Sequence, residues 1–555
     1  MRRTRGCSAG AALLLALLLW LVLYPLALVL MEGLRGPEGW TLVHVRDFVS
    51  RPTEMRALWA SLWISLASVV LAALIGIPLA LLLGRYDLPG GRVLGGLVAL
   101  PAVLPPLVGV VAFLFLYGET GFIPLLLMWL LGLEEPPWRL QGPGAILLVH
   151  AYSMYVYFYL LVRAALVSLD ASQLEAAASL GAGRWRTFRQ VVIPHLRPAL
   201  AGAALLTFMT ALGSFSAPYV FGGGFRVMPT QIVATRLNGE DQLAMVQTAS
   251  LTALALLALL LFRSDPREQV GGGRKGSGPT RIAIRRPLAR LLTGVAGWGL
   301  AALLLLPHLT LVLVSFVPLG TWTTEPLPPA YTLENYAALA LDPVRLRPLV
   351  NSIWLATVAT VAAVIIALSG ALLGARRSGA ARRAIEGLLA LPWAVPGTVF
   401  AIALATAFSV SKPLVGRFVL VGTLWILPLA YLVRNLPIAS RAISAGVRAL
   451  DPSLDEAAAS LGAGRRRTLL RVTLPLLRPA LLAGASLAFV TAFGDFVTSI
   501  MLYTYDTRPI SLEILSSLRQ ADVGVAAAYG VVLMLVSAAV FALGSGGQGR
   551  GGGPG

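Results

Sequence analysis

The sequence contains a single cysteine, few histidines and very little charge. Cys7 has no second cysteine to bond, so an intramolecular disulfide is excluded. Only 12% of the 555 residues are charged, against about 25% in an ordinary soluble domain. The four histidines are scattered without metal-ligand spacing, so no conventional metal site is expected. A soluble, metal-dependent enzyme is therefore a poor description of this chain.

Acidic residues are also scarce relative to basic ones, 25 against 44, which gives a formal net charge of +19. A nucleic-acid-binding protein gathers such charge on one face beside aromatic residues that stack on bases. Here the basic residues lie between apolar runs, where the positive-inside rule places them in a membrane protein. We therefore expect no nucleic-acid partner. A phosphate-binding loop is also absent, because Gly271–Gly273 and Lys275 lack the required spacing and no strand precedes them.

Long uncharged runs are abundant. Hydrophobic residues make up 57% of the chain, and the runs are close to the ~20 residues that cross a bilayer as a helix. The predicted fold is an all-α integral membrane protein built from two parallel repeats of about six transmembrane helices. The expected spans are 11–31, 58–83, 93–117, 144–168, 199–221 and 243–262, then 289–317, 349–374, 384–409, 415–436, 477–500 and 523–543.

The amino terminus is predicted to be cytoplasmic. Met1–Arg5 is basic, and the 21 uncharged residues from Ala11 to Met31 are long for a signal peptide, which favours an uncleaved first helix. With twelve crossings, this orientation puts most Lys and Arg residues on the cytoplasmic side. A further apolar piece, residues 122–133, carries Pro124 and is too short to cross. We interpret it as a re-entrant or surface segment.

Composition divides the chain into two transmembrane domains, residues 1–262 and 289–543. Residues 263–288 between them are polar, basic and rich in glycine, which is typical of a flexible linker. Its predicted location is cytoplasmic. Residues 544–555 form a low-complexity tail that is expected to be disordered.

An internal repeat connects the two domains. Leu169–Leu200 reads LDASQLEAAASLGAGRWRTFRQVVIPHLRPAL, and Leu450–Leu481 reads LDPSLDEAAASLGAGRRRTLLRVTLPLLRPAL. The copies are 281 residues apart and are identical at 22 of 32 positions, which chance does not produce. We call these segments the first elbow and the second elbow.

Each elbow is predicted to be a helix–turn–helix. In the first elbow, Ser172 and Glu175 have the S-x-x-E spacing of a capping box, which would start a short helix. Gly181 can adopt positive φ and end that helix. A basic amphipathic stretch follows, and Pro194 is expected to stop or bend it before the next span. The counterparts in the second elbow are Ser453, Glu456, Gly462 and Pro475.

The elbows resemble the cytoplasmic EAA loop of binding-protein-dependent ABC importer permeases. That loop has the pattern E-A-A-x-x-x-G followed, after nine residues, by hydrophobic-x-hydrophobic-Pro. Two such domains in one chain resemble the fused permeases of the ferric-iron and thiamine importers, relatives of the polyamine and phosphonate systems. The matching residues are Glu175, Ala176, Ala177, Gly181, Val191, Ile193 and Pro194, and Glu456, Ala457, Ala458, Gly462, Val472, Leu474 and Pro475.

The resemblance implies a transport mechanism and its partners. Each elbow would dock on one of two copies of a cytoplasmic ABC ATPase, and closure of the ATPases on ATP would rock the halves between inward- and outward-facing states. A periplasmic solute-binding protein would deliver the solute, and the chain would move it across the cell inner membrane. The chain would bind no cofactor and would not be an enzyme, because a separate subunit hydrolyses ATP. Ferric iron is the expected solute, with thiamine, polyamine and phosphonate as alternatives.

The roles of the charged elbow residues stay open at this stage. Glu175 and Glu456 could close their own helix caps or pair with a basic residue on the ATPase. A basic loop that holds anionic lipid is the alternative for the whole segment, but lipid binding needs only charge. The arginines are expected to serve topology and lipid contact more than partner recognition. They are Arg184, Arg186, Arg465, Arg466 and Arg467.

Few polar side chains are candidates for the translocation pathway. Asp495 lies in or near the eleventh span, where an ionised carboxylate costs about 2.5–3.5 kcal/mol, so it is expected to be functional or paired unless it reaches the hydrated interface. The repeat offset aligns it with Ser214. Tyr152, Tyr155 and Tyr159 share one face of the fourth span at i, i+3 and i+7. They would line the pathway or pack against a neighbouring helix.

Two other function classes fit the sequence less well than the importer. An ion-coupled secondary transporter would also have twelve spans, but it would carry more intramembrane ionisable residues and would have no use for a duplicated elbow. A membrane enzyme would need a nucleophile–base or metal constellation, and none is visible in the sequence. The sequence therefore favours the importer permease.

Overall fold

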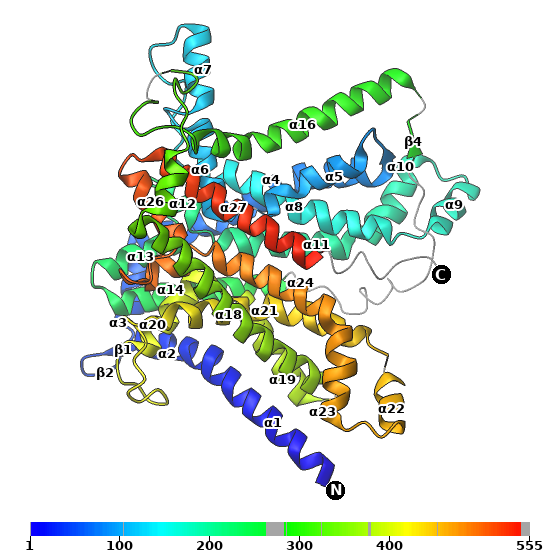
Figure 1. Ribbon diagram of the computed structural model, residues 1–555, viewed down its shortest axis with the longest axis vertical. Helices are drawn as coiled ribbons and strands as arrows, with labels where there is room; N and C mark the ends of the chain where they lie inside the picture. The colour runs from blue at the N-terminus through cyan, green and yellow to red at the C-terminus, as the bar shows by residue number, and fades with distance from the viewer. Residues whose placement is uncertain are drawn as a thin grey trace. The chain divides into compact units, whose positions relative to one another are not determined.

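The structure of the chain is a computed structural model, and it is almost entirely helical (Figure 1). The predicted all-α membrane fold is confirmed. Within the described residues, strands occur only as two short pairs, β1 Arg35–Gly36 with β2 Gly39–Trp40 and β3 Tyr86–Asp87 with β4 Ile282–Ala283. Most of the predicted linker and tail lie outside the described residues. The structure describes residues 2–103, 105–261, 282–284, 286–322, 325–375, 379–451 and 453–545.

Ten helical stretches in the described part of the chain are long and apolar enough to cross a membrane, and one bent pair raises the number to eleven. This agrees with the prediction of about twelve spans. The ten stretches are Ala9–Gly33, Pro52–Arg85, Pro106–Leu131, Gly142–Val167, Trp185–Leu212, Asp241–Leu261, Pro287–Val314, Pro343–Ala375, Arg465–Phe493 and Val523–Gly544.

The third predicted span of each half is broken by prolines. In the first half, α5 Gly91–Ala99 and the 3-10 turn η2 Leu100–Val103 lead into α6 Pro106–Tyr117. In the second half, α19 Ala380–Ala390, η5 Leu391–Trp393 and α20 Gly397–Phe408 form a pair bent by 107°. Proline lacks the backbone N–H that would continue the helix. Pro105 and Pro106 stand at the first break, and Pro392 and Pro396 at the second.

Two further segments differ in extent from the expected ones. Residues 122–133 form α7 Phe122–Leu131, which together with α6 makes up one of the ten stretches. The predicted span 415–436 instead becomes α21 Ile426–Ala449, which begins later and runs on to the second elbow. With 24 residues α21 is long enough to cross a bilayer, but it is not among the ten apolar stretches. Its repeat counterpart α8 Gly142–Val167 is one of them.

The chain forms two compact units, each built from separated stretches of sequence. Unit 1 contains residues 1–50, 232–252 and 332–555, and unit 2 contains residues 51–231 and 253–331. The first span of each half therefore belongs to the unit that is otherwise built mainly from the opposite half. The predicted domain boundaries at residues 262 and 289 follow the sequence repeat and stay a prediction.

Unit 2 is centred on three helices that pack against one another, α4 Pro52–Arg85, α8 and α11 Ile193–Leu212. Figure 1 shows α4 and α8 running side by side. The two helices approach closely at Gly76, where a β-carbon would lie 2.4 Å from the Tyr155 carbonyl oxygen. Helix α16 Pro287–Val314 packs on α5 and α6.

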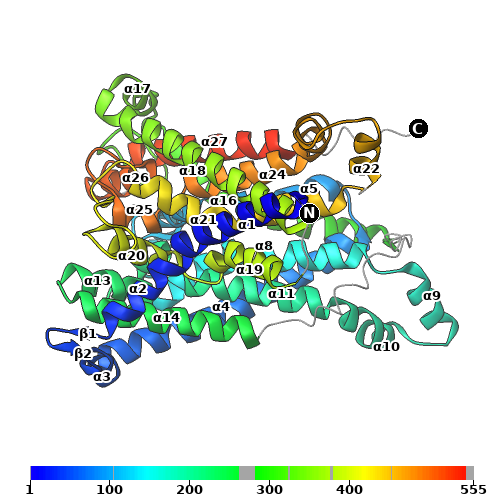
Figure 2. The ribbon, with the colours of Figure 1, turned by 90° about the horizontal axis from the view of Figure 1, so that it is seen from below.

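Unit 1 repeats this core with α18 Pro343–Ala375, α21 and α24 Leu474–Phe493. Helix α27 Val523–Ser545 packs on α24, and Figure 2 shows the two side by side.

The amino-terminal span, α1 Arg2–Leu18, η1 Leu19–Leu23 and α2 Tyr24–Gly33, is tied into unit 1. Helix α1 contacts α18 and α19, and α2 contacts α20. Lys412 Nζ lies 2.5 Å from Glu32 Oε1, and Trp20 Nε1 donates to the Leu414 carbonyl at 3.1 Å. The Tyr24 hydroxyl donates to the Pro413 carbonyl. These contacts give the first helix, predicted to be uncleaved, a packing role.

Replacing Gly76 with valine should force α4 away from α8 and lower the free energy of unfolding by about 1–3 kcal/mol, because the site has no room for added atoms. The matched control is Gly96→Val on α5, where a β-carbon meets nothing within 4 Å. Thermal unfolding of both purified variants in detergent measures the difference. Equal melting temperatures would contradict the close packing of α4 and α8.

Candidate functional site

The first elbow starts with an aspartate cap. Helix α9 spans Ala171–Ser179, and the side chain of Asp170 accepts a hydrogen bond from the Ser172 backbone N–H at 3.0 Å. In the second elbow, α22 spans Ser453–Ser460, and Asp451 accepts from the Ser453 N–H at 2.9 Å. That bond holds the pKa of the Asp451 carboxyl below its usual value.

The predicted capping box is therefore wrong. Ser172 lies inside α9 rather than before it, so Glu175 is not at the position from which it could close the cap. The aspartate two residues earlier is a charged acceptor and forms the stronger bond to the exposed N–H groups. Glu175 and Glu456 are both exposed to solvent.

Glycine ends the short helix in both elbows, as predicted. Gly181 and Gly462 both have φ of +73°. In the first elbow the Gly181 N–H donates to Ala178 O at 3.0 Å, and the Ala182 N–H donates to Ala177 O at 2.9 Å. The second elbow repeats both bonds at the same lengths. This pair of bonds is the Schellman motif, and it fixes the direction in which the chain leaves the helix.

The residue before each of these glycines is a leucine whose side chain is almost fully exposed to solvent. Leu180 is 87% exposed and Leu461 is 88% exposed. In Figure 1, α9 stands beyond the ends of α8 and α11, and α22 stands beyond the end of α24. Ala176 and Ala457 are exposed beside these leucines, Ala177 is half-buried and Ala458 is buried. Each elbow thus offers a small apolar tip next to a carboxylate, which is a surface suited to a protein partner.

The helix that leaves each elbow does not stop at its proline. In the first elbow, α10 Arg184–Thr187 passes through a π-helical turn, η3 Phe188–Val192, directly into α11, whose second residue is Pro194. The second elbow does the same through α23 Arg465–Thr468 and η6 Leu469–Thr473, with Pro475 at the start of α24. A π turn holds one extra residue, which makes room for a proline ring without its N–H. Each elbow is therefore continuous with a membrane span.

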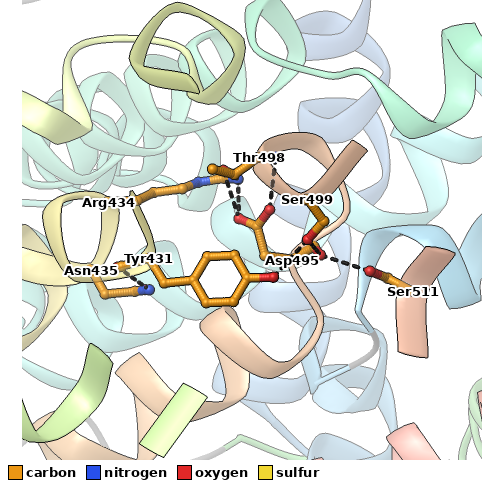
Figure 3. A network of polar contacts seen from close by, with 7 residues as sticks. All are labelled: Tyr431, Arg434, Asn435, Asp495, Thr498, Ser499 and Ser511. Carbon is orange, nitrogen blue, oxygen red and sulfur yellow. Dashed lines mark hydrogen bonds and ion pairs between the residues drawn. The ribbon is translucent and has the colours of Figure 1, made fainter. Parts of the chain in front are cut away.

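A second cluster of polar side chains lies inside unit 1 and is shown in Figure 3. It joins α21 to the break after α24, where the chain leaves the helix at Gly494 and restarts as α25 Val497–Leu502. Helix α26 Ile510–Arg519 contributes one residue. We call this cluster the polar hub. Its members are Tyr431, Arg434, Asn435, Asp495, Thr498, Ser499 and Ser511.

Asp495 is the centre of the polar hub, and its side chain is only 1% exposed. One carboxylate oxygen accepts from the Thr498 N–H at 2.8 Å. The other accepts from the Thr498 hydroxyl at 3.2 Å and from Arg434 Nη1. The backbone carbonyl of Asp495 accepts from the hydroxyls of Ser499 and Ser511 at 2.5 and 2.8 Å. Both carboxylate oxygens are thus occupied by the protein itself.

The repeat counterpart in unit 2 is built without an ion pair. Ser214, which the offset aligns with Asp495, lies 2.9 Å from His150 Nε2, and Ser68 lies 2.8 Å from His150 Nδ1. The same offset aligns His150 with Tyr431, whose hydroxyl lies 2.6 Å from Ser499 Oγ. The two units therefore join the same elements with different chemistry.

The tyrosine stripe of α8 packs within unit 2. Tyr155 and Tyr159 are completely buried, and their hydroxyls donate to the Val98 and Gly95 carbonyls at 2.6 and 3.0 Å. The Tyr152 hydroxyl donates to the Leu304 carbonyl of α16 at 2.8 Å. These bonds correspond to the packing alternative. A pathway role for the three residues stays a prediction.

Comparison with known proteins identifies the family. The profile described as "Binding-protein-dependent transport system inner membrane component" matches twice, at residues 76–264 and 359–545, which together make up more than half of the chain. The chain belongs to this family. The duplicated match also confirms the internal repeat and the predicted fused permease.

The permease has relatives along most of its length. It is 32% identical over 497 residues to the probable ABC transporter permease protein y4fN of Sinorhizobium fredii, covering 88% of this chain and 87% of that protein. It is 28% identical over 536 residues to the ferric transport system permease protein FbpB of Actinobacillus pleuropneumoniae, covering 96% and 77%. These relatives are permeases and not enzymes, so the permease is a multi-pass membrane component of an ABC importer.

Asp495 was expected from the sequence of the permease, but its partner was not. Arg434 fell inside the predicted span 415–436, so an intramembrane cation was visible in the sequence. The structure places it on α21 against the Asp495 carboxylate, with 29% of its side chain exposed. Tyr431, Ser499 and Ser511 were also missed, because hydroxyl residues in apolar helices have no distinctive spacing.

Replacing Asp495 with asparagine should leave a charged guanidinium unpaired in the interior, which costs about 3–5 kcal/mol of unfolding free energy. The double variant Asp495→Asn with Arg434→Gln should recover much of that loss because no charge is left unpaired. The control is Asp506→Asn, which breaks an exposed pair with Arg347 at 2.5 Å and should cost at most about 1 kcal/mol.

Chemical or thermal unfolding of the purified permease variants measures these costs. If Asp495→Asn were no more costly than Asp506→Asn, the pair in the polar hub would not stabilise unit 1.

Proposed function

We propose that this permease imports ferric iron across the cell inner membrane, with its amino terminus in the cytoplasm. Two copies of a separate cytoplasmic ABC ATPase drive it, and a periplasmic solute-binding protein supplies the solute. ATP is bound and hydrolysed by the ATPase, while this chain binds no cofactor and provides the route through the bilayer by alternating access.

The duplicated elbow is the observation that carries this proposal. From Glu175 to Arg184 and from Glu456 to Arg465 the two copies are identical at every position. Both copies share the aspartate cap, the Schellman turn and the exposed leucine. Two equal surfaces fit two equal partners, which supports a pair of identical ATPase subunits.

The elbows are also built to transmit force. Helix α9 lies between α8 and α11 in the chain, and both of these helices pack on α4. Helix α22 lies in the same way between α21 and α24, which pack on α18. A push on either short helix would move the core of its unit, because the capped ends leave it little freedom. Glu175 and Glu456, free of a capping role, would pair with basic residues of the ATPase.

Ferric iron is favoured because the relatives named for it span both halves. The two ferric permeases cover 96% and 92% of this chain. Relatives named for molybdenum, sulfate and 2-aminoethylphosphonate transport cover only 42%, 40% and 45%. Thiamine, polyamine and phosphonate remain the alternatives. Among the described residues no group of three or more His, Cys, Asp or Glu could hold a metal ion, so the iron would not pass as a bare ion in a fixed site.

Changing Gly181 and Gly462 together to valine should abolish solute uptake while ATP hydrolysis by the complex continues. Valine does not tolerate φ of +73°, so the turn would open and the leucine tip would no longer meet the ATPase. The matched control changes Gly183 and Gly464 to alanine, where a β-carbon meets nothing within 4 Å. Uptake and ATP hydrolysis are measured in vesicles that contain the permease with its ATPase and binding protein.

Normal uptake by the Gly181/Gly462 variant would disprove the coupling role of the elbows. Uptake without the ATPase would disprove the ABC mechanism itself. A Glu175→Ala, Glu456→Ala variant should also lose uptake, and its membrane level, checked by immunoblot, should stay unchanged.

A further inference from the structure

Three arginines follow one line along α21. Arg434, Arg441 and Arg448 are spaced seven residues apart. Seven residues fall about 20° short of two full turns, so the three side chains share one face of the helix. At about 1.5 Å per residue, the line extends about 21 Å from the middle of α21 to the second elbow. We call it the arginine stripe.

The arginine stripe is accessible along its length, whereas the deeper part of α21 that carries Arg434 is mostly buried. Between residues 426 and 440, nearly all side chains of α21 apart from Arg434 are buried. Arg434 is 29% exposed, Arg448 is 62% exposed, and Arg441 is exposed. A charged side chain at membrane depth faces the interior of a bundle or a water-filled cavity and not lipid. Arg434 therefore faces the interior of the bundle or a water-filled cavity rather than lipid.

The opposite side of the stripe lies against the bent pair α19–η5–α20. Each arginine contacts one residue of this element, in reverse order along the chain. Arg448 Nη2 lies 3.0 Å from Glu386 Oε1, and the Arg441 guanidinium lies 3.8 Å from the centre of the Trp393 ring. Arg434 packs on Gly397, where a β-carbon would lie 2.9 Å from Arg434 Cζ. These contacts fix where the guanidinium groups lie, and they leave most of the N–H donors unused.

The charges along the stripe do not balance. Arg434 faces the Asp495 carboxylate, and Arg448 shares Glu386 with Arg382, whose Nε lies 3.1 Å from it. Arg441 forms no ion pair among the described residues, and its partner is an aromatic ring. Four guanidinium groups thus face two carboxylates. Both carboxylate oxygens of Asp495 are bonded within the polar hub. The charged groups that remain free to contact a solute are therefore guanidinium groups.

Topology does not explain this pattern. The positive-inside rule accounts for arginines at the cytoplasmic ends of spans, which covers Arg448 but not Arg434, about 21 Å deeper. The repeat counterparts on α8 are Ser153, Leu160 and Val167. Leu160 and Val167 are 44% and 65% exposed. The other half carries a single arginine beside these positions, Arg163, which donates to the Tyr159 hydroxyl at 2.7 Å. The line of three arginines is therefore a feature of one half only.

We propose that the arginine stripe is the surface along which this permease guides its solute, and that the solute passes as an anion. It is either an oxyanion or a negatively charged chelate of ferric iron, because the three guanidinium groups of the stripe, with Arg382 beside them, would repel a bare metal cation. Arg434 and Arg441 contact the solute. Asp495 is a positioning residue that holds Arg434 through Nη1 and leaves its other N–H groups available. This inference rests on the proposed function and narrows its substrate.

The test measures anion binding to the full chain in lipid nanodiscs, without ATPase or binding protein. Thermal unfolding is followed against sodium molybdate as the oxyanion and ferric citrate as the anionic chelate, with sodium chloride at equal ionic strength as the reference. Both anions or one of them should raise the melting temperature of the wild-type chain. Arg441→Gln, which leaves no carboxylate unpaired, should weaken the apparent affinity about tenfold, or about 1.4 kcal/mol.

Two further variants make the outcome decisive. Arg434→Gln combined with Asp495→Asn removes a charge of the stripe without an unpaired carboxylate and should also weaken anion binding. Arg417→Gln removes an exposed arginine from loop 409–425 and should bind like the wild type. Stabilisation by molybdate alone identifies an oxyanion, and stabilisation by ferric citrate alone identifies a chelate.

The proposal is overturned if neither anion stabilises the wild-type chain beyond chloride, or if Arg441→Gln and the double variant bind as tightly as the wild type. Because the assay needs no ATP, a failure of elbow coupling does not affect it. Conversely, ATP-driven uptake that is indifferent to Arg441→Gln would reject the arginine stripe and leave the importer intact.

Discussion

Every helix break in this permease has to satisfy its own polar groups, because the hydrocarbon core offers no water to do so. The structure meets this constraint with hydroxyl and carboxylate side chains at fixed places. Ser61 and Ser352, at equivalent points of α4 and α18, accept from the backbone N–H groups of Met228 and Ile510 at 2.6 and 2.8 Å. Asp495 does the same for α25. The breaks are thus rigid joints rather than weak points.

Local rules predicted the elbows better than the membrane interior. The repeat, the positive φ of Gly181 and the short helices follow from neighbouring residues, and they were readable in the sequence. The residue that caps each short helix lies two positions before the predicted serine, and spacing alone chose the wrong candidate. The pairing of Arg434 with Asp495 joins residues 61 positions apart, and no local pattern indicates it. The bends at Pro105 and Pro396 were visible as prolines, but their angles depend on tertiary packing.

The two halves are equal at the elbows and unequal in the interior. The elbows share ten consecutive residues and the same hydrogen bonds, as two identical ATPase subunits would require. In the interior, His150 and Ser214 stand where Tyr431 and Asp495 stand, and Ser153, Leu160 and Val167 stand at the positions of the arginine stripe. Fusion of the halves in one chain permits this division, because each half can change its inner surface while the pair keeps a fixed stoichiometry.

The first span of each half packs in the unit built mainly from the other half, and this sets an order of events during biosynthesis. Helices α1 and α2 end at Gly33, but α18, which α1 contacts, begins only at Pro343. At about 5–20 residues per second, the ribosome needs roughly 15–60 s to cover that distance. For that interval α1 has no α18 to pack on, and Glu32 is without its partner Lys412. Unit 1 can therefore complete its packing only late in translation. In a chain truncated within its second half, α1 would have no partner helix and would be open to quality-control proteolysis.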